Sequence, residues 1–285
     1  MLIIDGKAIA KEKKAEIQKQ LESYLAEGKR RPGLAVIRMN EDDASGRYVR
    51  NIIRNAENLG IQSFEETLSV DQSQDDLIAV IEKLNANEEV DGIILQMPLP
   101  EQVDPLVVQN KIAADKDVEG ITKENAAKLY LGNESGFAPC TPAAVMAILD
   151  TLDLELSGKN AVVIGRSNVV GKPQAMLLLN RNCTVTICHS RSKNQAEICS
   201  KADILVSAVG RAKMVDSSYT NPEQIVIDVA INTDEEGNLC GDVNFDEVKD
   251  KVKAITPVPG GVGSVTNAIL MDATLTAYKN HLGIK

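Results

Sequence analysis

Short apolar runs alternate with segments of helical length along this chain, and this alternation limits the folds that it can adopt. In the second half the apolar runs are residues 161–164, 184–187, 203–208 and 224–229, separated by helix-length segments near 170–180 and 193–201. Runs as continuous as these are typical of strands that are buried on both faces. We therefore predict an α/β fold containing a Rossmann-like, doubly wound parallel sheet.

The first half shows the same alternation in a weaker form. Helical patterns cover residues 7–27, 44–59 and 75–85, and apolar runs cover 34–39 and 91–97. A Pro-containing passage at residues 137–142 precedes a further helix over 143–150, and it marks a domain boundary. After a Gly- and Pro-rich passage, a last helix is predicted over 265–278. The sequence therefore predicts two α/β domains with room for a ligand between them.

Composition and charge exclude several classes of protein. The formal net charge of −10 disfavours binding to nucleic acid, which depends on excess Lys and Arg. No apolar stretch is long enough for a membrane span, and the start of the chain does not resemble a signal peptide, so we expect a cytoplasmic protein without membrane contacts. Five cysteines without a CxxC pair and only two histidines predict neither disulfides nor a metal site.

The passage Asn160–Pro173 carries the first motif with a chemical meaning. It reads as a strand, a tight turn at Gly165-Arg166-Ser167 and the start of a helix, which places backbone N–H groups where a pyrophosphate binds. Ser167 stands where the usual fingerprint has its second glycine. An ordinary turn between strand and helix remains the alternative on this motif alone.

The end of the next strand favours NADP over NAD. NAD-specific sites usually carry an acidic residue there to hold the ribose 2′-hydroxyl. This chain has Cys188-His-Ser-Arg-Ser-Lys193, with hydroxyls and cations but no carboxylate. Arg191, Lys193 and Arg166 are therefore candidate ligands of a 2′-phosphate. Solvated surface cations remain the alternative for Arg191 and Lys193.

Five motifs in order resemble one known family. They are GRSNVVGKP at 165–173, CHSR at 188–191, DGIILQMPLP at 91–100, DKDVEG at 115–120 and TPVPGGVG at 256–263. This set is similar to the bifunctional methylenetetrahydrofolate dehydrogenase/methenyltetrahydrofolate cyclohydrolase family. The resemblance implies a folate-binding catalytic domain of residues 1–140 plus 266–285 and an NADP-binding domain of residues 141–265. The final helix then returns to the first domain, folate lies in the cleft between domains, and the protein is a homodimer.

The resemblance also implies an activity and its residues. Members oxidise 5,10-methylene-tetrahydrofolate by hydride transfer to NADP, and commonly hydrolyse the methenyl product to 10-formyl-tetrahydrofolate. The residues expected at the NADP are Gly165, Arg166, Ser167, Ser190, Arg191 and Ile231. Those expected at the folate are Tyr48, Gln96, Pro98, Glu119, Pro259, Gly260 and Gly261, of which Tyr48, Gln96 and Glu119 are the catalytic candidates.

One departure from the family pattern affects the hydrolysis. A lysine normally follows the tyrosine by four residues, on the same helical face, but here Ile52 follows Tyr48. Removal of a hydride depends on positioning and needs no net proton transfer. Hydrolysis needs acid–base groups, which isoleucine lacks. We therefore expect the dehydrogenase to be present and the cyclohydrolase to be absent or weak.

Other departures fall near the expected folate site. Glu119 replaces a usual aspartate and keeps a carboxylate on a longer stem, and Asn40 stands at a usual glycine. Arg47, Arg50 and Arg54 share a helical face, where they either attract the glutamate tail of folate or are merely solvated. Three alternatives stay open: a fully bifunctional enzyme, a folate- or NADP-binding regulatory protein without turnover, and an NADP oxidoreductase for another substrate.

Overall fold

The computed structural model describes residues 1–284, which form two compact units. The six-stranded unit contains residues 1–11 and 139–269, and the three-stranded unit contains residues 12–138 and the chain from Leu270 onward. Two long helices, α1 (Gly6–Ala26) and α10 (Val262–His281), have residues in both units.

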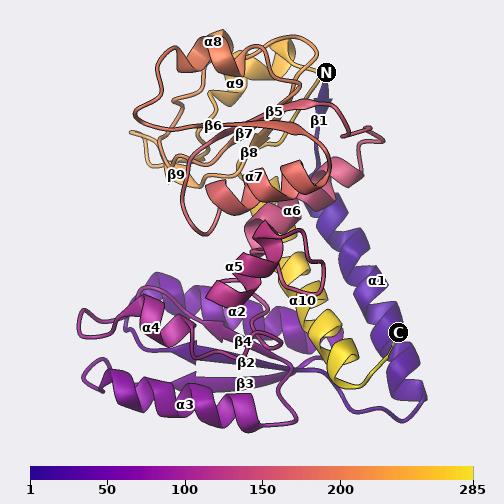
Figure 1. Ribbon diagram of the computed structural model, residues 1–285, viewed down its shortest axis with the longest axis vertical. Coiled ribbons are helices and arrows are strands. Elements are labelled where there is room, and N and C mark those ends of the chain that lie inside the picture. Colours follow the sequence, from indigo (N-terminus) through magenta and orange to yellow (C-terminus); the bar gives the residue numbers. More distant parts are fainter. Residues whose placement is uncertain (285) are drawn as a thin grey trace. The chain divides into compact units, whose positions relative to one another are not determined.

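The six-stranded unit is a doubly wound parallel sheet, as predicted (Figure 1). Its strand order is β1-β11-β8-β7-β5-β6. The strands are β1 (Leu2–Ile3), β5 (Asn160–Ile164), β6 (Thr184–Cys188), β7 (Ile204–Ser207), β8 (Ile225–Asp228) and β11 (Ala254–Ile255). The helices are α6 (Cys140–Asp150), α7 (Gly171–Asn180), α8 (Gln195–Cys199) and α9 (Phe245–Val248), with 3-10 turns at Ser217–Tyr219 and Lys249–Lys251. A separate antiparallel pair joins β9 (Asn232–Thr233) to β10 (Leu239–Cys240).

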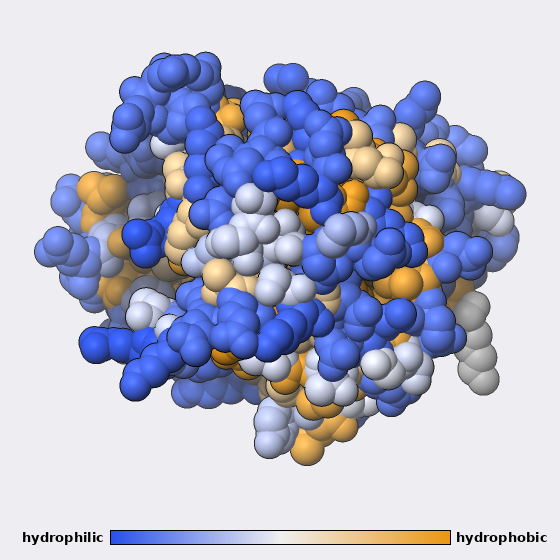
Figure 2. All heavy atoms as spheres, turned by 90° about the horizontal axis from the view of Figure 1, so that it is seen from above, coloured by the Kyte–Doolittle hydropathy of each residue, from blue (hydrophilic) through white to orange (hydrophobic). Residues whose placement is uncertain are grey.

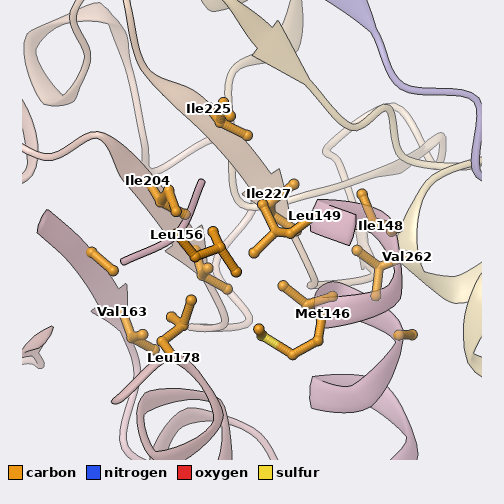
Figure 3. Close-up of a cluster of buried hydrophobic side chains, with 14 of the residues drawn as sticks. Met146, Ile148, Leu149, Leu156, Val163, Leu178, Ile204, Ile225, Ile227 and Val262 are labelled. Carbon is orange, nitrogen blue, oxygen red and sulfur yellow. The ribbon is translucent and has the colours of Figure 1, made fainter. Parts of the chain in front are cut away.

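Alternate residues of these strands enter two hydrophobic clusters, one on each face of the sheet. Val163 belongs to the cluster that includes α6 and α7, whereas its neighbour Val162 belongs to the cluster that includes Cys199 of α8 and Val248 of α9. Figure 3 shows Ile204 and Ile227 turned toward Leu149 of α6 in the first cluster. Burial on both faces explains why β5, β7 and β8 read as continuous apolar runs. Strand β6 lies at the edge of the sheet, and three of its five residues are exposed.

The first residues of the chain lie in the six-stranded unit, although the predicted boundaries place them in the folate-binding domain. Leu2 pairs with Ala254 and Ile3 pairs with Ile255, so β1 extends the sheet beyond β11. Ile4 is then buried in the cluster with α6. A strand of two residues is too short to show a period in the sequence.

The three-stranded unit is a parallel sheet of order β3-β2-β4. Its strands are β2 (Gly33–Arg38), β3 (Gln62–Thr67) and β4 (Gly92–Leu95), and its remaining helices are α2 (Asp43–Leu59), α3 (Gln74–Ala86), α4 (Pro105–Gln109) and α5 (Lys123–Tyr130). Helices α3 and α4 share a hydrophobic cluster with β2 and β4. Helix α2 packs against β2 and β3 and lies across the sheet from α3 in Figure 1. The sequence pattern does not predict β3, because this edge strand is polar and partly exposed.

The C-terminal helix returns to the three-stranded unit, as the resemblance implied. Tyr278 of α10 is fully buried, and its hydroxyl donates a 2.8 Å hydrogen bond to the backbone oxygen of Arg30. No helix within residues 1–284 combines the length and the apolar character that crossing a membrane requires. The face in Figure 2 is mostly hydrophilic, with apolar residues in small separate groups.

Candidate active site

Two glycines shape the turn between β5 and α7. Gly165 has a φ of +127°, and a Cβ there would lie 2.4 Å from the backbone oxygen of Ala208. A Cβ on Gly171 would lie 2.3 Å from the backbone oxygen of Gly165. Neither position has room for a side chain, so the strand, the turn and the helix start pack by their backbones. This is the close approach that a dinucleotide fold uses to expose backbone N–H groups to a pyrophosphate.

Ser167 caps the start of α7 from the second position of the fingerprint. Its hydroxyl oxygen accepts hydrogen bonds from the backbone N–H groups of Val170 at 3.1 Å and Gly171 at 3.3 Å. These groups lack partners within the helix, and a serine side chain is well suited to accept from them. The departure from the glycine pattern therefore has a structural reason.

A pocket of about 400 Å³ opens beside this turn. Its lining includes four of the predicted cofactor residues, namely Gly165, Arg166, Ser167 and Ser190. Arg211 lines it as well, and among the described residues that line it there is no Asp or Glu. Two guanidinium groups without a carboxylate suit a phosphorylated ribose. Arg191 is not part of the lining; its backbone N–H donates to Nδ1 of His189.

Asp242, which no sequence motif indicates, organises one wall of this pocket. One carboxylate oxygen accepts from the Ser207 hydroxyl at 2.9 Å and from the backbone N–H of Val209 at 2.7 Å. The other accepts from the backbone N–H of Arg211 at 2.7 Å and from the Asn232 side chain at 3.1 Å. Asp242 is fully buried, so these bonds are shielded from water. They fix the backbone on which the Arg211 side chain is carried.

A second pocket, of about 190 Å³, lies in the same unit. It brings Ile231, which the resemblance assigns to NADP, together with the loop Pro259-Gly260-Gly261, which it assigns to folate. Asp228 also lines it, and its buried carboxylate accepts from the backbone N–H groups of Ala230, Asp242 and Val243. Burial raises the pKa of Asp228 to about 7, although these backbone hydrogen bonds oppose the rise.

Tyr48 and Ile52 differ in burial although both lie on α2. Tyr48 is 45% exposed, whereas Ile52 is 0% exposed. Residues four apart are turned by about 40° round a helix, because each residue turns it by about 100°. This turn places Tyr48 at the edge of the exposed face and Ile52 within the face that packs on the sheet. Ile52 therefore acts as a core residue.

Hydrogen bonds connect the segments that follow β2 and β4. The side-chain amide of Gln96, which is partly exposed, donates to the backbone oxygen of Met97 at 2.6 Å. The Asn40 side chain donates to the backbone oxygen of Pro98 at 3.0 Å and accepts from Arg38 at 3.2 Å. Asn40 thus binds the segment after β4, which carries two of the predicted folate residues, Gln96 and Pro98.

Glu119 is half-buried beyond the end of β4. Burial and the nearby carboxylate of Asp117 raise the pKa of Glu119 to about 7, while a hydrogen bond from the Leu95 backbone N–H limits the rise. Asp117 is fully buried and accepts from the backbone N–H groups of Ile121 and Thr122. A carboxyl group with a pKa near neutrality is suited to donating and accepting protons.

Comparison with known proteins identifies both halves of the chain. Residues 4–119 match the model of the tetrahydrofolate dehydrogenase/cyclohydrolase catalytic domain, and residues 139–282 match that of the same family's NAD(P)-binding domain. The chain is 46% identical to bifunctional protein FolD 1 of Desulfitobacterium hafniense, over 98% of this chain and 99% of that protein. It is 48% identical to bifunctional protein FolD of Streptococcus thermophilus, over 97% of each.

Solved structures agree with this assignment. The bifunctional FolD dehydrogenase/cyclohydrolase of Campylobacter jejuni has a TM-score of 0.96 at 39% identity, over 98% of this chain and 99% of that one. FolD of Trypanosoma brucei, solved with NADP and an inhibitor, has a TM-score of 0.92 at 34% identity, over 99% of this chain and 98% of that one. The chain therefore belongs to the tetrahydrofolate dehydrogenase/cyclohydrolase family.

Proposed function

We propose that this protein oxidises 5,10-methylene-tetrahydrofolate to 5,10-methenyl-tetrahydrofolate with NADP. The pocket beside Gly165 carries the proposal, because Arg166 and Arg211 line it without a carboxylate. When bound, NADP+ accepts the hydride of the reaction. The homologous FolD structure that was solved with NADP supports this choice of cofactor.

In this proposal the residues of the chain bind NADP and folate and orient them for the reaction. Gly165 and Gly171 keep the backbone clear for the pyrophosphate, and Arg166 with Ser190 binds the 2′-phosphate. The folate residues carried over from the family are Tyr48, Gln96, Pro98, Glu119, Pro259, Gly260 and Gly261.

Initial rates with NADP+ and NAD+ test the dehydrogenase. Neutralising one arginine that binds a phosphate costs roughly 10- to 100-fold in kcat/KM, so Arg166→Gln should lose this much with NADP+ and much less with NAD+. Lys201→Gln, an exposed residue paired with Glu197, is the control. The same experiment on Arg191→Gln decides whether the Arg191 side chain contributes to the preference for NADP+ over NAD+. Binding of NADP+ and folate without turnover would favour the regulatory-protein alternative.

We further propose that the protein is also a methenyl-tetrahydrofolate cyclohydrolase. The names of the relatives, which are bifunctional, favour this alternative over the expectation that hydrolysis is lost. Glu119 is the observation on the chain itself that favours it. Hydrolysis takes a proton from water and breaks a C–N bond, and a carboxyl group with a pKa of about 7 supplies both the base and the acid at neutral pH. The Ile52 side chain supplies neither.

Loss of methenyl-tetrahydrofolate absorbance tests the hydrolase. Wild-type protein should hydrolyse it well above the buffer rate, and Glu119→Gln should remove most of that excess. Hydrolysis at the buffer rate by the wild type would restore the monofunctional interpretation. Ile52→Lys should then gain activity, with Ile52→Met as the control for disturbing a fully buried position.

A homodimer, which the family resemblance implies, and a cytoplasmic location, which the sequence pattern predicts, also remain proposals. Light scattering coupled to size exclusion should give twice the chain mass of 30.7 kDa. A monomer at micromolar concentration would contradict the first of them.

A further inference from the structure

Arg38 ends β2 at the edge of the three-stranded sheet where Gln96 follows β4. Ile37 and Leu95 are paired across the two strands, and both enter the cluster with α3 and α4. The backbone N–H of Gln96 donates to the backbone oxygen of Ile37 at 2.9 Å, so Gln96 continues this pairing. Since side chains alternate between the faces of a sheet, Arg38 and Gln96 both turn toward the face that α2 covers. Parallel sheets bind their ligands at this carboxyl edge.

Two hydrogen bonds fix the guanidinium group of Arg38. Its Nε donates to Oδ1 of Asn40 at 3.2 Å, and its Nη2 donates to the backbone oxygen of Asp42 at 3.0 Å. These bonds use two of the five N–H groups that a guanidinium carries. Asn40 in turn donates to the backbone oxygen of Pro98 at 3.0 Å. The charge of Arg38 is therefore held close to a predicted folate residue.

Gly46 makes room for this guanidinium group. The three atoms nearest to a Cβ built on Gly46 all belong to Arg38, and Nη1 would lie only 2.9 Å away. Gly46 is buried near the start of α2, where glycine destabilises a helix relative to alanine. A cation near the start of a helix also meets the positive end of the helix dipole. Neither feature favours the folding of α2, whereas a guanidinium group that serves a ligand accounts for both.

Arg38 supplies a positive charge to a site that has lost one at position 52. The family resemblance implies a lysine there, but Ile52 is fully buried and uncharged. The side chain that holds Nε of Arg38 is Asn40, which itself stands at a usual glycine. Two departures from the family pattern thus fit one arrangement, in which the cation comes from β2 instead of α2.

We infer that Arg38 is a substrate-binding residue whose guanidinium group donates to the oxygen atom that hydrolysis adds to the one-carbon group. The inference rests on the proposed cyclohydrolase function for the identity of the substrate. In that reaction the water oxygen bonds to the methenyl carbon, and the bond from this carbon to N5 breaks with its electron pair going to N5. Both water protons leave the oxygen; N5 takes up one, and the other is released through Glu119. Arg38 keeps its own protons throughout and stabilises the charge that builds on the oxygen.

The rates of the two reactions test the inference. Loss of one donor to a charged oxygen in the transition state costs about 100-fold, so Arg38→Gln should lower kcat of the cyclohydrolase by about this factor. The kcat of the dehydrogenase should change by less than about threefold, because hydride transfer depends on positioning and adds no oxygen. Arg38→Lys keeps the charge and should retain more hydrolysis than Arg38→Gln.

Arg31→Gln is the matched control, because Arg31 is exposed and precedes the opposite end of β2. It should leave both rates unchanged. Equal losses of the two activities in Arg38→Gln would limit Arg38 to a structural role and contradict the inference.

Gly46→Ala moves the guanidinium group without changing its charge. The new Cβ displaces Nη1, so hydrolysis should fall at least about tenfold. Stability to urea should not fall, since alanine favours the helix and only the flexible end of Arg38 must move. Unchanged hydrolysis in this variant would show that the place of the guanidinium group does not matter to the reaction.

Binding measurements separate this inference from the proposed function. 10-Formyl-tetrahydrofolate carries the oxygen that Arg38 should meet, and tetrahydrofolate lacks it. Calorimetric titration at pH 8 without oxygen should give the wild type a Kd about tenfold lower for the formyl compound, and Arg38→Gln should abolish this difference. Equal affinities in the wild type, or a difference that persists in Arg38→Gln, would overturn the inference. Absence of hydrolysis with the difference in affinity intact would count against the cyclohydrolase alone.

Discussion

The carboxylate of Asp91 accepts two parallel hydrogen bonds from the guanidinium group of Arg30, each 2.7 Å long. Asp91 is fully buried, and it also accepts from the backbone N–H of Gly33 at 2.8 Å and lies 2.8 Å from Nδ1 of His281. Arg30 stacks over the ring of Tyr278 at 5.2 Å. One carboxylate thus joins the start of β4 to β2 and to the last helix.

Removing the charge of Asp91 should destabilise the protein severely. Asp91→Asn leaves Arg30 without its counter-ion and turns an amide N–H2 group toward hydrogen-bond donors. Loss of one partner of a buried ion pair lowers the free energy of unfolding by about 3–5 kcal/mol. Urea unfolding at pH 7 measures the difference. Glu197→Gln removes one partner of an exposed pair and should change the free energy of unfolding by less than about 1 kcal/mol. Equal effects of the two substitutions would mean that the Arg30–Asp91 pair contributes little to the stability of the protein.

The sequence predicts elements whose side chains repeat with a clear period, and it misses contacts made across the fold. Strands β5, β7 and β8 were predicted because burial on both faces produces apolar runs. Strand β3 was missed because its polar residues lie on an edge. The role of Asp242 was missed because its carboxylate meets Ser207, 35 residues earlier, only in the folded chain.

A methyl group at position 171 should disrupt the nucleotide loop. In Gly171→Ala the new Cβ would lie 2.3 Å from the backbone oxygen of Gly165 and 2.7 Å from the backbone nitrogen of Arg166, so the loop must move. We expect the Kd for NADP+ to rise at least about 100-fold, since displaced N–H groups no longer meet the pyrophosphate. Calorimetric titration measures the affinity.

Gly263→Ala is the matched control for folding in this experiment. Its Cβ would meet only the Ile231 side chain, at 3.5 Å, which is ordinary van der Waals contact. Its free energy of unfolding should stay within about 1 kcal/mol of the wild type. Unchanged NADP+ affinity in Gly171→Ala would contradict the assignment of this loop to the cofactor.

Asp242 should affect NADP+ affinity without belonging to the pocket lining. Asp242→Asn replaces one accepting oxygen by an N–H2 group that faces N–H donors of Val209 or Arg211. The free energy of unfolding should fall by about 1–3 kcal/mol, and the Kd for NADP+ should rise because the Arg211 backbone is no longer fixed. Asp250→Asn, an exposed position, should change neither quantity. Loss of stability with unchanged affinity would limit Asp242 to a structural role.

Glu119 should make the protein less stable as the pH rises from about 5 to 7. Its pKa rises from 4.5 to about 7 on folding, so in this interval the folded chain holds a proton that the unfolded chain has released. Stability falls with pH wherever the folded state binds more protons, and the contribution is complete below the unfolded value and lost above the folded one. Asp228, whose pKa also rises to about 7, adds a slope of the same sign.

The variant Glu119→Gln isolates the contribution of Glu119, because glutamine has no proton to release in this range. Urea unfolding at pH 5.5, 6.5, 7.5 and 8.5 should show the variant gaining stability relative to wild type as the pH rises, with the gap constant above about pH 8. Glu82→Gln, at an exposed position on α3, should instead run parallel to wild type. Parallel curves for Glu119→Gln would mean that Glu119 is ionised in the folded protein throughout. It would then be unable to donate the proton that hydrolysis requires, and the proposed cyclohydrolase activity would need a different acid.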